Sequence, residues 1–109
     1  MTRVPDPHEV QIEVDGRLAA VAEVSATDDP IVVRSAMHIE PGHLPPGTRS
    51  ALIDAVLDDP QVCAASHLSA SMPAGDAELL GRIRERADSV EARRAGSTSL
   101  VEADLRPQR

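Results

Sequence analysis

The chain has 109 residues, a formal net charge of −7 and no Phe, Tyr or Trp. This length allows one domain and excludes a second independent core, and the lack of any run of about 18 apolar residues excludes a membrane-spanning helix, so we expect a soluble, cytoplasmic protein. Acidic residues outnumber basic ones in residues 1–75, where they repel phosphate groups and disfavour nucleic acids and membranes as partners.

Three strands are predicted in the first part of the chain. Glu9–Val14 alternates polar and apolar residues, and Arg17–Val24 continues as an apolar-rich run. The Asp15-Gly16 pair between them tolerates the positive φ angles of a tight type I′ turn, which predicts a hairpin. Ser25–Pro30 is expected to turn the chain into a third strand at Ile31–Ile39, so that three antiparallel strands follow one another.

A proline-rich loop and a helix are predicted next. Glu40–Gly47 contains three prolines, which cannot donate hydrogen bonds to a strand ladder, and it leads into a helix that begins near Thr48. This helix must end at Asp58-Asp59-Pro60, because the residue before a proline is pushed out of the α region. Val62–Met72 then predicts a central strand, since its apolar content is nearly continuous at the start.

The last part of the chain predicts a second helix followed by a strand or a hairpin. Asp76 is a good N-cap for the helix. Val90–Arg94 and Thr98–Leu105 are strand-like and flank a turn at Ala95-Gly96.

These elements define the fold class and the extent of the domain. Their order is βββ-α-β-α-β(β), which predicts an α+β or α/β sandwich with a mixed, mainly antiparallel sheet and two helices packed on one or both of its faces. Residues 1–8 are expected to form a flexible arm, residues 9–105 the single α/β domain, and residues 106–109 a flexible tail.

The loop before the first helix is the best candidate for a binding site. Gly47, Thr48 and Arg49 stand at the start of the helix, where unpaired backbone N–H groups and the positive end of the helix dipole favour anions. The structural alternative is that Pro45 and Pro46 only stiffen the turn between strand and helix. No GxxxxGK[ST] or GxGxxG motif supports a nucleotide-binding fold,.

The element order and the position of this loop carry a resemblance to a known family. Residues 9–105 resemble the GNAT superfamily of acetyltransferases without its first strand and first two helices. In that family the loop reads Gln/Arg-x-x-Gly-x-Gly/Ala, and its amides hold the pyrophosphate of acetyl-CoA; here it reads His43-Leu-Pro-Pro-Gly-Thr-Arg-Ser-Ala51. The resemblance implies a GNAT-like fold, with acetyl-CoA or CoA held by Gly47, Thr48 and Arg49 if the cofactor binds.

The chain departs from the pattern of the family in the residues that serve the chemistry. Pro45 and Pro46 have no N–H to donate, and Arg49 stands near the place of a small residue,. The Tyr that many members use as a general acid is also missing. The sequence therefore predicts no catalytic residue and no cofactor, with acetyl-CoA or CoA as the alternative.

The positions of the histidines in the sequence do not indicate a metal site or a nucleophilic catalytic site. His38 and His43 flank Glu40, but their spacing matches no familiar ligand motif,. Ser66 and His67 are neighbours on a predicted strand, so their side chains point to opposite faces and His67 cannot activate Ser66. We expect no metal site.

Five arginines lie close together in the last part of the sequence: Arg82, Arg84, Arg86, Arg93 and Arg94. Arg82 and Arg84 each have an acidic residue four positions away, which suits ion pairs on one helix. Arg93 and Arg94 have no such partner, so we predict that they belong to an interaction surface.

The composition also favours association. Without aromatic rings the core must consist of Val, Leu, Ile, Ala and Met, so it is thin and gains from further burial. We predict a noncatalytic binding or regulatory module that forms a homo-oligomer or binds a protein partner, through an edge strand such as Val10–Val14 or Thr98–Leu105. The alternative is a minimal acyltransferase or acyl-CoA-binding protein that uses the loop before the first helix.

Overall fold

The computed structural model describes residues 7–106. Most of the predicted arm (1–8) and tail (106–109) lies outside the described residues, and His8 already belongs to the first strand. The elements in chain order are β1 (His8–Val14), β2 (Arg17–Ala26), β3 (Val32–Ile39), α1 (Thr48–Asp58), α2 (Pro60–Cys63), β4 (His67–Pro73), α3 (Ala77–Arg86), β5 (Ala87–Ala95) and β6 (Thr98–Leu105).

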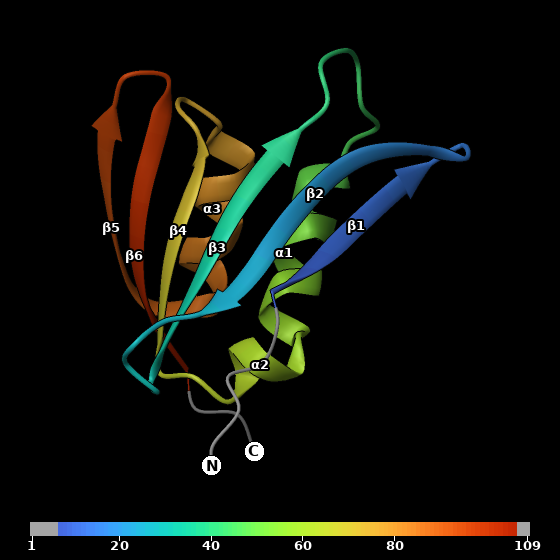
Figure 1. Cartoon of the computed structure of the whole chain (residues 1–109). Coiled ribbons are helices and arrows are strands. Elements are labelled where there is room, and N and C mark those ends of the chain that lie inside the picture. The colour runs from blue at the N-terminus through green and yellow to red at the C-terminus, as the bar shows by residue number, and fades with distance from the viewer. Residues whose placement is uncertain (1–6, 107–109) are drawn as a thin grey trace.

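The strands form one sheet in the order β1-β2-β3-β4-β6-β5 (Figure 1). All neighbouring strands are antiparallel except β3 and β4, which are parallel. Parallel neighbours need a crossover connection, and α1 with α2 provides it. The predicted mixed, mainly antiparallel sheet is confirmed, with β4 in the centre as expected.

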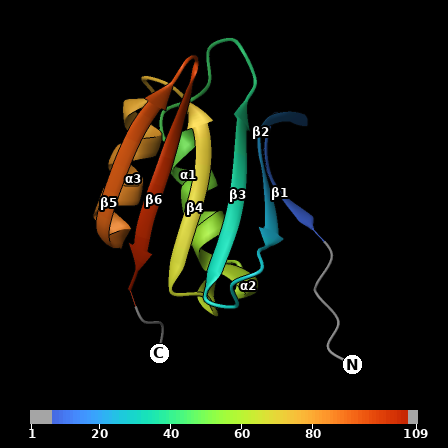
Figure 2. The same cartoon turned by 60° about the vertical axis from the view of Figure 1, so that its left-hand side comes forward.

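The helices lie on one face of the sheet (Figures 1 and 2). α1 packs on β1 and β2 and against α3, which packs on β5. The core lies between these layers and is aliphatic throughout; its largest fully buried apolar side chains are Leu52, Ile53, Leu68, Leu79, Ile83, Val24, Val33, Val56, Val62 and Val101. Within residues 7–106 no helix covers the opposite face, which we call the bare face.

The first hairpin has the predicted turn. Asp15 has a φ of 52° and Gly16 a φ of 78°, as a type I′ turn requires,. β1 is an edge strand, as predicted. The prediction that Thr98–Leu105 lies at the other edge is wrong, because β6 lies between β4 and β5 and leaves β5 at that edge.

The predicted strand Val62–Met72 begins five residues too early. Asp59 caps a short helix, α2, by accepting a hydrogen bond from the Gln61 N–H (2.9 Å), and Pro60 occupies its first position,. β4 starts only at His67. A continuous apolar run has no period of its own, so it could not distinguish this helical turn from the strand that follows.

The sequence predicts that no helix of the chain spans a membrane. None of the helices within residues 7–106 has both the length and the apolar character needed to cross a bilayer.

Candidate functional site

The loop before α1 closes on itself at the start of the helix. Gly47 adopts a left-handed conformation with a φ of 88°, which favours glycine,. Thr48 donates from both its N–H (3.2 Å) and its hydroxyl (2.8 Å) to the Pro45 carbonyl. The N–H of Ala51 makes the first helical bond, to the Gly47 carbonyl (2.9 Å). The N–H of Thr48 and that of Ala51 are therefore satisfied within the loop and helix.

A carboxylate from α3 binds another N–H in the first turn of α1, that of Ser50. Glu78 Oε2 accepts hydrogen bonds from the Ser50 N–H (2.9 Å) and the Ser50 hydroxyl (3.0 Å). Beside it, Arg49 Nε donates to Asp76 Oδ2 (2.8 Å). We call Arg49, Ser50, Asp76 and Glu78 the helix-end cluster. A negative group at the positive end of a helix is stabilising, and here the protein supplies that group itself.

The start of α3 places these carboxylates. Asp76 is the N-cap and accepts a hydrogen bond from the Leu79 N–H (3.2 Å), as predicted, while Glu78 lies in the first turn,. The two helices begin at the same end of the molecule, so their N-terminal carboxylates and N–H groups meet there. Sequence reasoning missed the contact between Glu78 and Ser50, because nothing local to either residue indicates it.

The predicted site residues Gly47, Thr48 and Arg49 thus lie together at the start of α1, with Arg49 held by Asp76. The nearby hollow of about 880 Å³ lies between the β1–β2 turn and residues 40–45, and none of these three residues lines it. Pro45 and Pro46 are exposed in the loop. The loop therefore stands open, and two of its hydrogen-bond donors at the helix start, the N–H groups of Thr48 and Ser50, are engaged.

β3 and β4 separate toward the same end of the sheet. Their pairing runs from Val32–His67 to Ala36–Ser71, and β3 continues to Ile39 and β4 to Pro73 beyond the last pair. Figure 1 shows the two strands diverging there. In open α/β sheets, ligands bind outside the carboxyl ends of the strands, where neighbouring connections leave in different directions.

A second polar cluster lies on the bare face and was not anticipated. His67 Nε2 lies 2.7 Å from Glu102 Oε1, and its Nδ1 lies 3.0 Å from Asp104 Oδ1. Ser69 donates to Glu102 (2.8 Å) and Ser89 to Asp104 (2.7 Å). These five side chains connect β4, β6 and β5, and they meet because the strand register sets His67 opposite Asp104 and Ser69 opposite Glu102.

These contacts change the protonation of the three titratable groups. The hydrogen bond to Glu102 raises the pKa of His67, against partial burial and with help from Asp104. Burial alone would raise the pKa of Glu102, but hydrogen bonds from His67 and Ser69 outweigh it and lower the pKa. Hydrogen bonds from Ser89 and His67 lower the pKa of Asp104. When it is protonated, the imidazole donates to both carboxylates and bridges them across β4 and β6.

The bridge predicts a pH dependence of stability. The folded pKa of His67 is raised above its ordinary value of 6.5, so its contribution is complete below that pH and is lost as the pH rises through the folded pKa. We expect the wild-type free energy of unfolding to fall relative to a His67→Gln variant as the pH rises above 6.5 and through the raised pKa of His67,. Urea unfolding followed by far-ultraviolet circular dichroism measures this difference, and equal slopes for the two proteins would contradict it.

The arginines divide between the helix layer and the edge strand. Arg82 donates to Asp54 at 2.8 and 3.0 Å and pairs with Glu85 at 2.9 Å, while Arg86 reaches Asp54 at 3.2 Å and Asp58 at 3.0 Å. The hydrogen bond from Arg82 lowers the pKa of Asp54 despite partial burial, and Arg86 adds to the effect. Asp54 thereby connects α1 to α3.

The ion pairs predicted within the second helix are wrong. Glu78 binds Ser50 of α1 instead of Arg82, because the N-terminus of α1 offers it a free N–H. Asp88 lies in β5, beyond the end of the helix that carries Arg84, and pairs with Arg106 at 3.3 Å.

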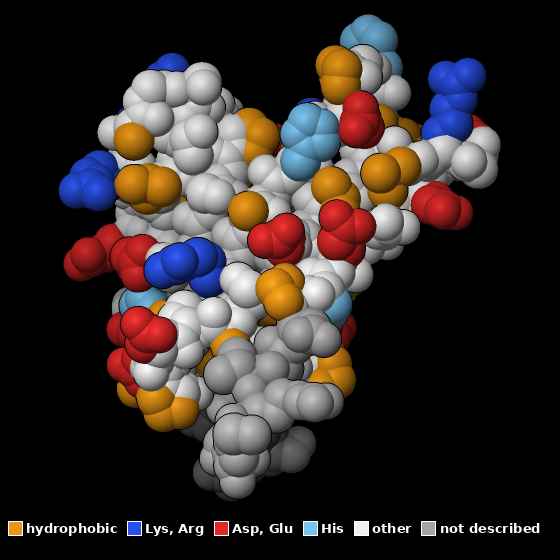
Figure 3. All heavy atoms as spheres, viewed as in Figure 1, with side chains coloured by type: hydrophobic (Ala, Val, Ile, Leu, Met, Phe, Trp, Pro, Cys, Tyr) orange, Lys and Arg blue, Asp and Glu red, His pale blue; other side chains and the backbone are white. Residues whose placement is uncertain are grey.

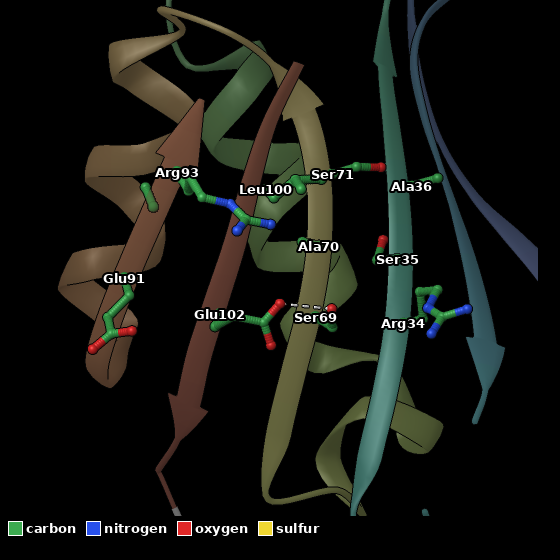
Figure 4. A pocket seen from close by; sticks show the side chains of 11 residues that line it. Arg34, Ser35, Ala36, Ser69, Ala70, Ser71, Glu91, Arg93, Leu100 and Glu102 are labelled. Carbon is green, nitrogen blue, oxygen red and sulfur yellow. Dashed lines mark hydrogen bonds between the residues drawn. The ribbon is translucent and has the colours of Figure 1, made fainter. Parts of the chain in front are cut away.

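Arg93 and Arg94 are both exposed on the edge strand β5. Arg93 leans over β6 toward β4 and lines a hollow on the bare face (Figure 4). Arg94 donates to the Gly96 carbonyl at 3.1 Å. The predicted pair of arginines is therefore split, since neighbours on a strand point to opposite faces.

The histidines within residues 7–106 do not lie close to one another. His38 Nε2 lies 3.3 Å from Glu40 Oε1, and across residues 7–106 no three His, Cys, Asp or Glu side chains are arranged to hold a metal ion.

Comparison with known proteins places the fold. No protein-family model matches the sequence, and no curated protein matches it. A GNAT-family acetyltransferase from Streptococcus pneumoniae matches the structure with a TM-score of 0.61 and 10% identity, over 89% of this chain and 65% of that one. The chain has a GNAT-like fold. The GNAT domain of PAT from S. lividans matches with a TM-score of 0.62 and 14% identity, over 92% and 61% of the two chains.

A third GNAT-like match was solved with a ligand. It is a Salmonella typhimurium protein classed as an acetyltransferase and determined with its cofactor acetyl-CoA, with a TM-score of 0.59 and 14% identity over 88% of this chain and 62% of that chain. This chain therefore spans less than two thirds of the length of each of the three proteins. The resemblance inferred from the sequence is confirmed for the fold.

Proposed function

We propose that the chain is a noncatalytic binding module built on a GNAT-like fold. The observation that supports this most directly is the contact of the Glu78 carboxylate with the Ser50 N–H at the start of α1. An anionic cofactor would need that position, and the carboxylate would repel it. The module therefore binds its partners elsewhere on the molecule.

The residues around α1 do not fit the pyrophosphate of acetyl-CoA. Of the backbone groups in the loop and first turn, Pro45 and Pro46 have no N–H, the Thr48 N–H is bonded to Pro45, and the Ser50 N–H is bonded to Glu78. Arg49 is the nearest cation, and Asp76 neutralises it. A phosphate placed here would meet two carboxylates and few free donors.

A second candidate function is the binding of acyl-CoA, and the separation of β3 from β4 supports it. This separation lies beside the start of α1 in a fold that, in the Salmonella protein, holds acetyl-CoA. In this case Gly47, Thr48 and Arg49 would contact the cofactor after Glu78 had moved away.

A thermal-shift experiment separates the two functions. A ligand present at 100 times its dissociation constant stabilises the folded state by about 2.7 kcal/mol. We expect millimolar acetyl-CoA or CoA not to raise the melting temperature of the wild-type chain. Circular dichroism is used to follow the melting, because the protein lacks Trp and Tyr. A saturable rise would contradict the noncatalytic function and favour the second candidate.

The matched control replaces the blocking carboxylate. Glu78→Gln removes the charge and keeps an oxygen that can accept from Ser50, and Glu78→Ala also removes the acceptor. If the carboxylate excludes the cofactor, both variants gain a melting-temperature response to CoA that the wild type lacks. If neither responds, the other features of this end of the molecule, namely Asp76 and the missing N–H groups of Pro45 and Pro46, are sufficient to exclude it.

A further inference from the structure

The bare face of the sheet presents its side chains in rows that cross the strands. The strand register sets Arg93, Leu100, Ser71, Ala36 and Glu23 side by side on β5, β6, β4, β3 and β2. This row, which we call the upper row, is positive at the β5 end, negative at the β2 end and small or apolar in the middle.

The row below it has the opposite polarity. In the same strand order it consists of Glu91, Glu102, Ser69, Arg34 and Ser25. This lower row is negative on the β5 side of β4 and positive on the β3 side. Figure 3 shows acidic and basic side chains mixed on this face, and Figure 4 shows the residues of both rows that line the hollow.

The centre of both rows is a shallow hollow of about 510 Å³. Its lining includes the small side chains of Ala36, Ser69 and Ser71, with Arg93 on one side and Arg34 on the other. Small residues let a second layer approach closely, and packed sheets lie about 10 Å apart. Within the described residues, the side chains of Arg34, Arg93 and Glu23 have no hydrogen-bond or ion-pair partner.

We propose that the bare face binds a second copy of this chain, face to face, about a twofold axis that runs along β4. Rotation about this axis exchanges the strands on the two sides of β4. It leaves the position of each residue along the strand direction unchanged. It therefore sets Arg93 opposite the partner's Glu23, two strands from β4 on either side. It sets Glu102 opposite the partner's Arg34, one strand away on either side.

Most of the remaining positions of the two rows agree with this arrangement, and of the charges in the rows only Glu91, which faces the partner's Ser25, is left without an opposite charge. Leu100 meets the partner's Ala36, and Ser69 and Ser71 meet their own copies at the axis, where the small side chains leave room. Each ion pair occurs twice, as an isologous interface requires. The strands of the two sheets run in the same direction, which is the aligned packing of β-sandwiches.

The other possible axis in the plane of the sheet, perpendicular to the strands, fits less well. It would set Arg93 opposite the partner's Glu91, but Glu102 would face Leu100, Arg34 would face Ala36 and Glu23 would face Ser25. Three charges of the two rows would then be covered without a partner, against one, Glu91, for the axis along β4, and covering an unpaired charge is costly. The charges of the two rows therefore favour the axis along β4.

Light scattering with refractive-index detection tests the dimer on the full chain. We expect a dimer at micromolar concentration that weakens at high salt. Arg93→Glu and Glu23→Arg should each weaken it on the order of tenfold or more, because each substitution creates two like-charge contacts. Arg94→Glu is the matched control, with the same change of charge on the next residue of β5, and should leave the dimer intact.

The charge-swapped double variant gives the sharpest result. Arg93→Glu combined with Glu23→Arg should restore the dimer, because both ion pairs re-form with reversed polarity. Restoration by Glu91→Arg instead of Glu23→Arg would overturn the proposed axis. A wild-type chain that stays monomeric, or single variants that dimerise like the wild type, would overturn the proposal as a whole.

A crosslinking measurement covers the case in which a charge variant fails to fold. Ser71→Cys in a Cys63→Ala background places one thiol per copy beside the axis, and a short bifunctional maleimide should join the two copies. Ser97→Cys, in the β5–β6 turn, should not be joined. Equal crosslinking of both variants would contradict the proposed face. These measurements involve no CoA, so their failure is distinct from failure of the proposed noncatalytic function.

Discussion

Replacing Leu52 with alanine is expected to lower the free energy of unfolding by about 2–5 kcal/mol, because the substitution removes buried methyl groups and leaves a cavity. Leu52 is fully buried on α1, in the layer between α1 and the sheet. Small domains have about 5–15 kcal/mol of stability in total, and this core contains no aromatic ring that could supply more. The substitution should therefore remove a large share of the stability of the fold.

Chemical denaturation followed by far-ultraviolet circular dichroism measures this loss, since the chain has no Trp or Tyr for fluorescence. The control is Leu18→Ala, which truncates the same side chain at a position that is 41% exposed on β2. We expect the control to change stability by no more than about 0.5 kcal/mol. Similar losses in both variants would show that burial at Leu52 is not what stabilises the fold.

Replacing Asp76 with alanine is expected to lower the free energy of unfolding by about 1–2 kcal/mol, because the substitution removes the N-cap of α3. The same carboxylate pairs with Arg49, so the variant also releases a link between α1 and α3. Its side chain is only 11% exposed, and the lost contacts are therefore only partly replaced by water.

Asp76→Asn separates the two contributions of this residue. Asparagine can still accept from the Leu79 N–H, but it carries no charge to pair with Arg49. We expect Asp76→Asn to lose less than half of what Asp76→Ala loses, measured by the same denaturation experiment. Equal losses would assign the stabilisation to the ion pair and contradict the capping role.

The parts of the fold that the sequence predicts correctly have local causes. The Asp15-Gly16 turn, the start of α1 at Thr48, and the cap of α3 at Asp76 each depend on a few neighbouring residues. The error at Val62–Ala65 arose where the local pattern has no period, and the cap that decides it belongs to Asp59 and Pro60,. Local sequence patterns therefore predicted most element types correctly. The prediction was wrong where two adjacent elements share one apolar run.

The candidate site could be predicted only in part. The loop at Gly47–Arg49 follows from its prolines and glycine, but the contact of Glu78 with Ser50 depends on the packing of α3 beside α1, and these two residues are far apart in sequence. The bridge from His67 to Glu102 and Asp104 likewise depends on the register between β4 and β6. Neither contact follows from spacing along the chain.

The single parallel ladder gives the sheet a seam. On one side, β1, β2 and β3 come from residues 8–39, and on the other, β4, β6 and β5 come from residues 67–105. Within the described residues, the ladder that joins the two halves consists of five paired positions, from Val32 to Ala36 on β3 with their partners on β4. The β1–β2, β2–β3 and β5–β6 pairs form over short stretches of chain, whereas the β3–β4 and β4–β6 pairs must each close a longer loop that contains a helix, which costs entropy,. The two ladders of β4 are therefore expected to be the last parts of the sheet to assemble.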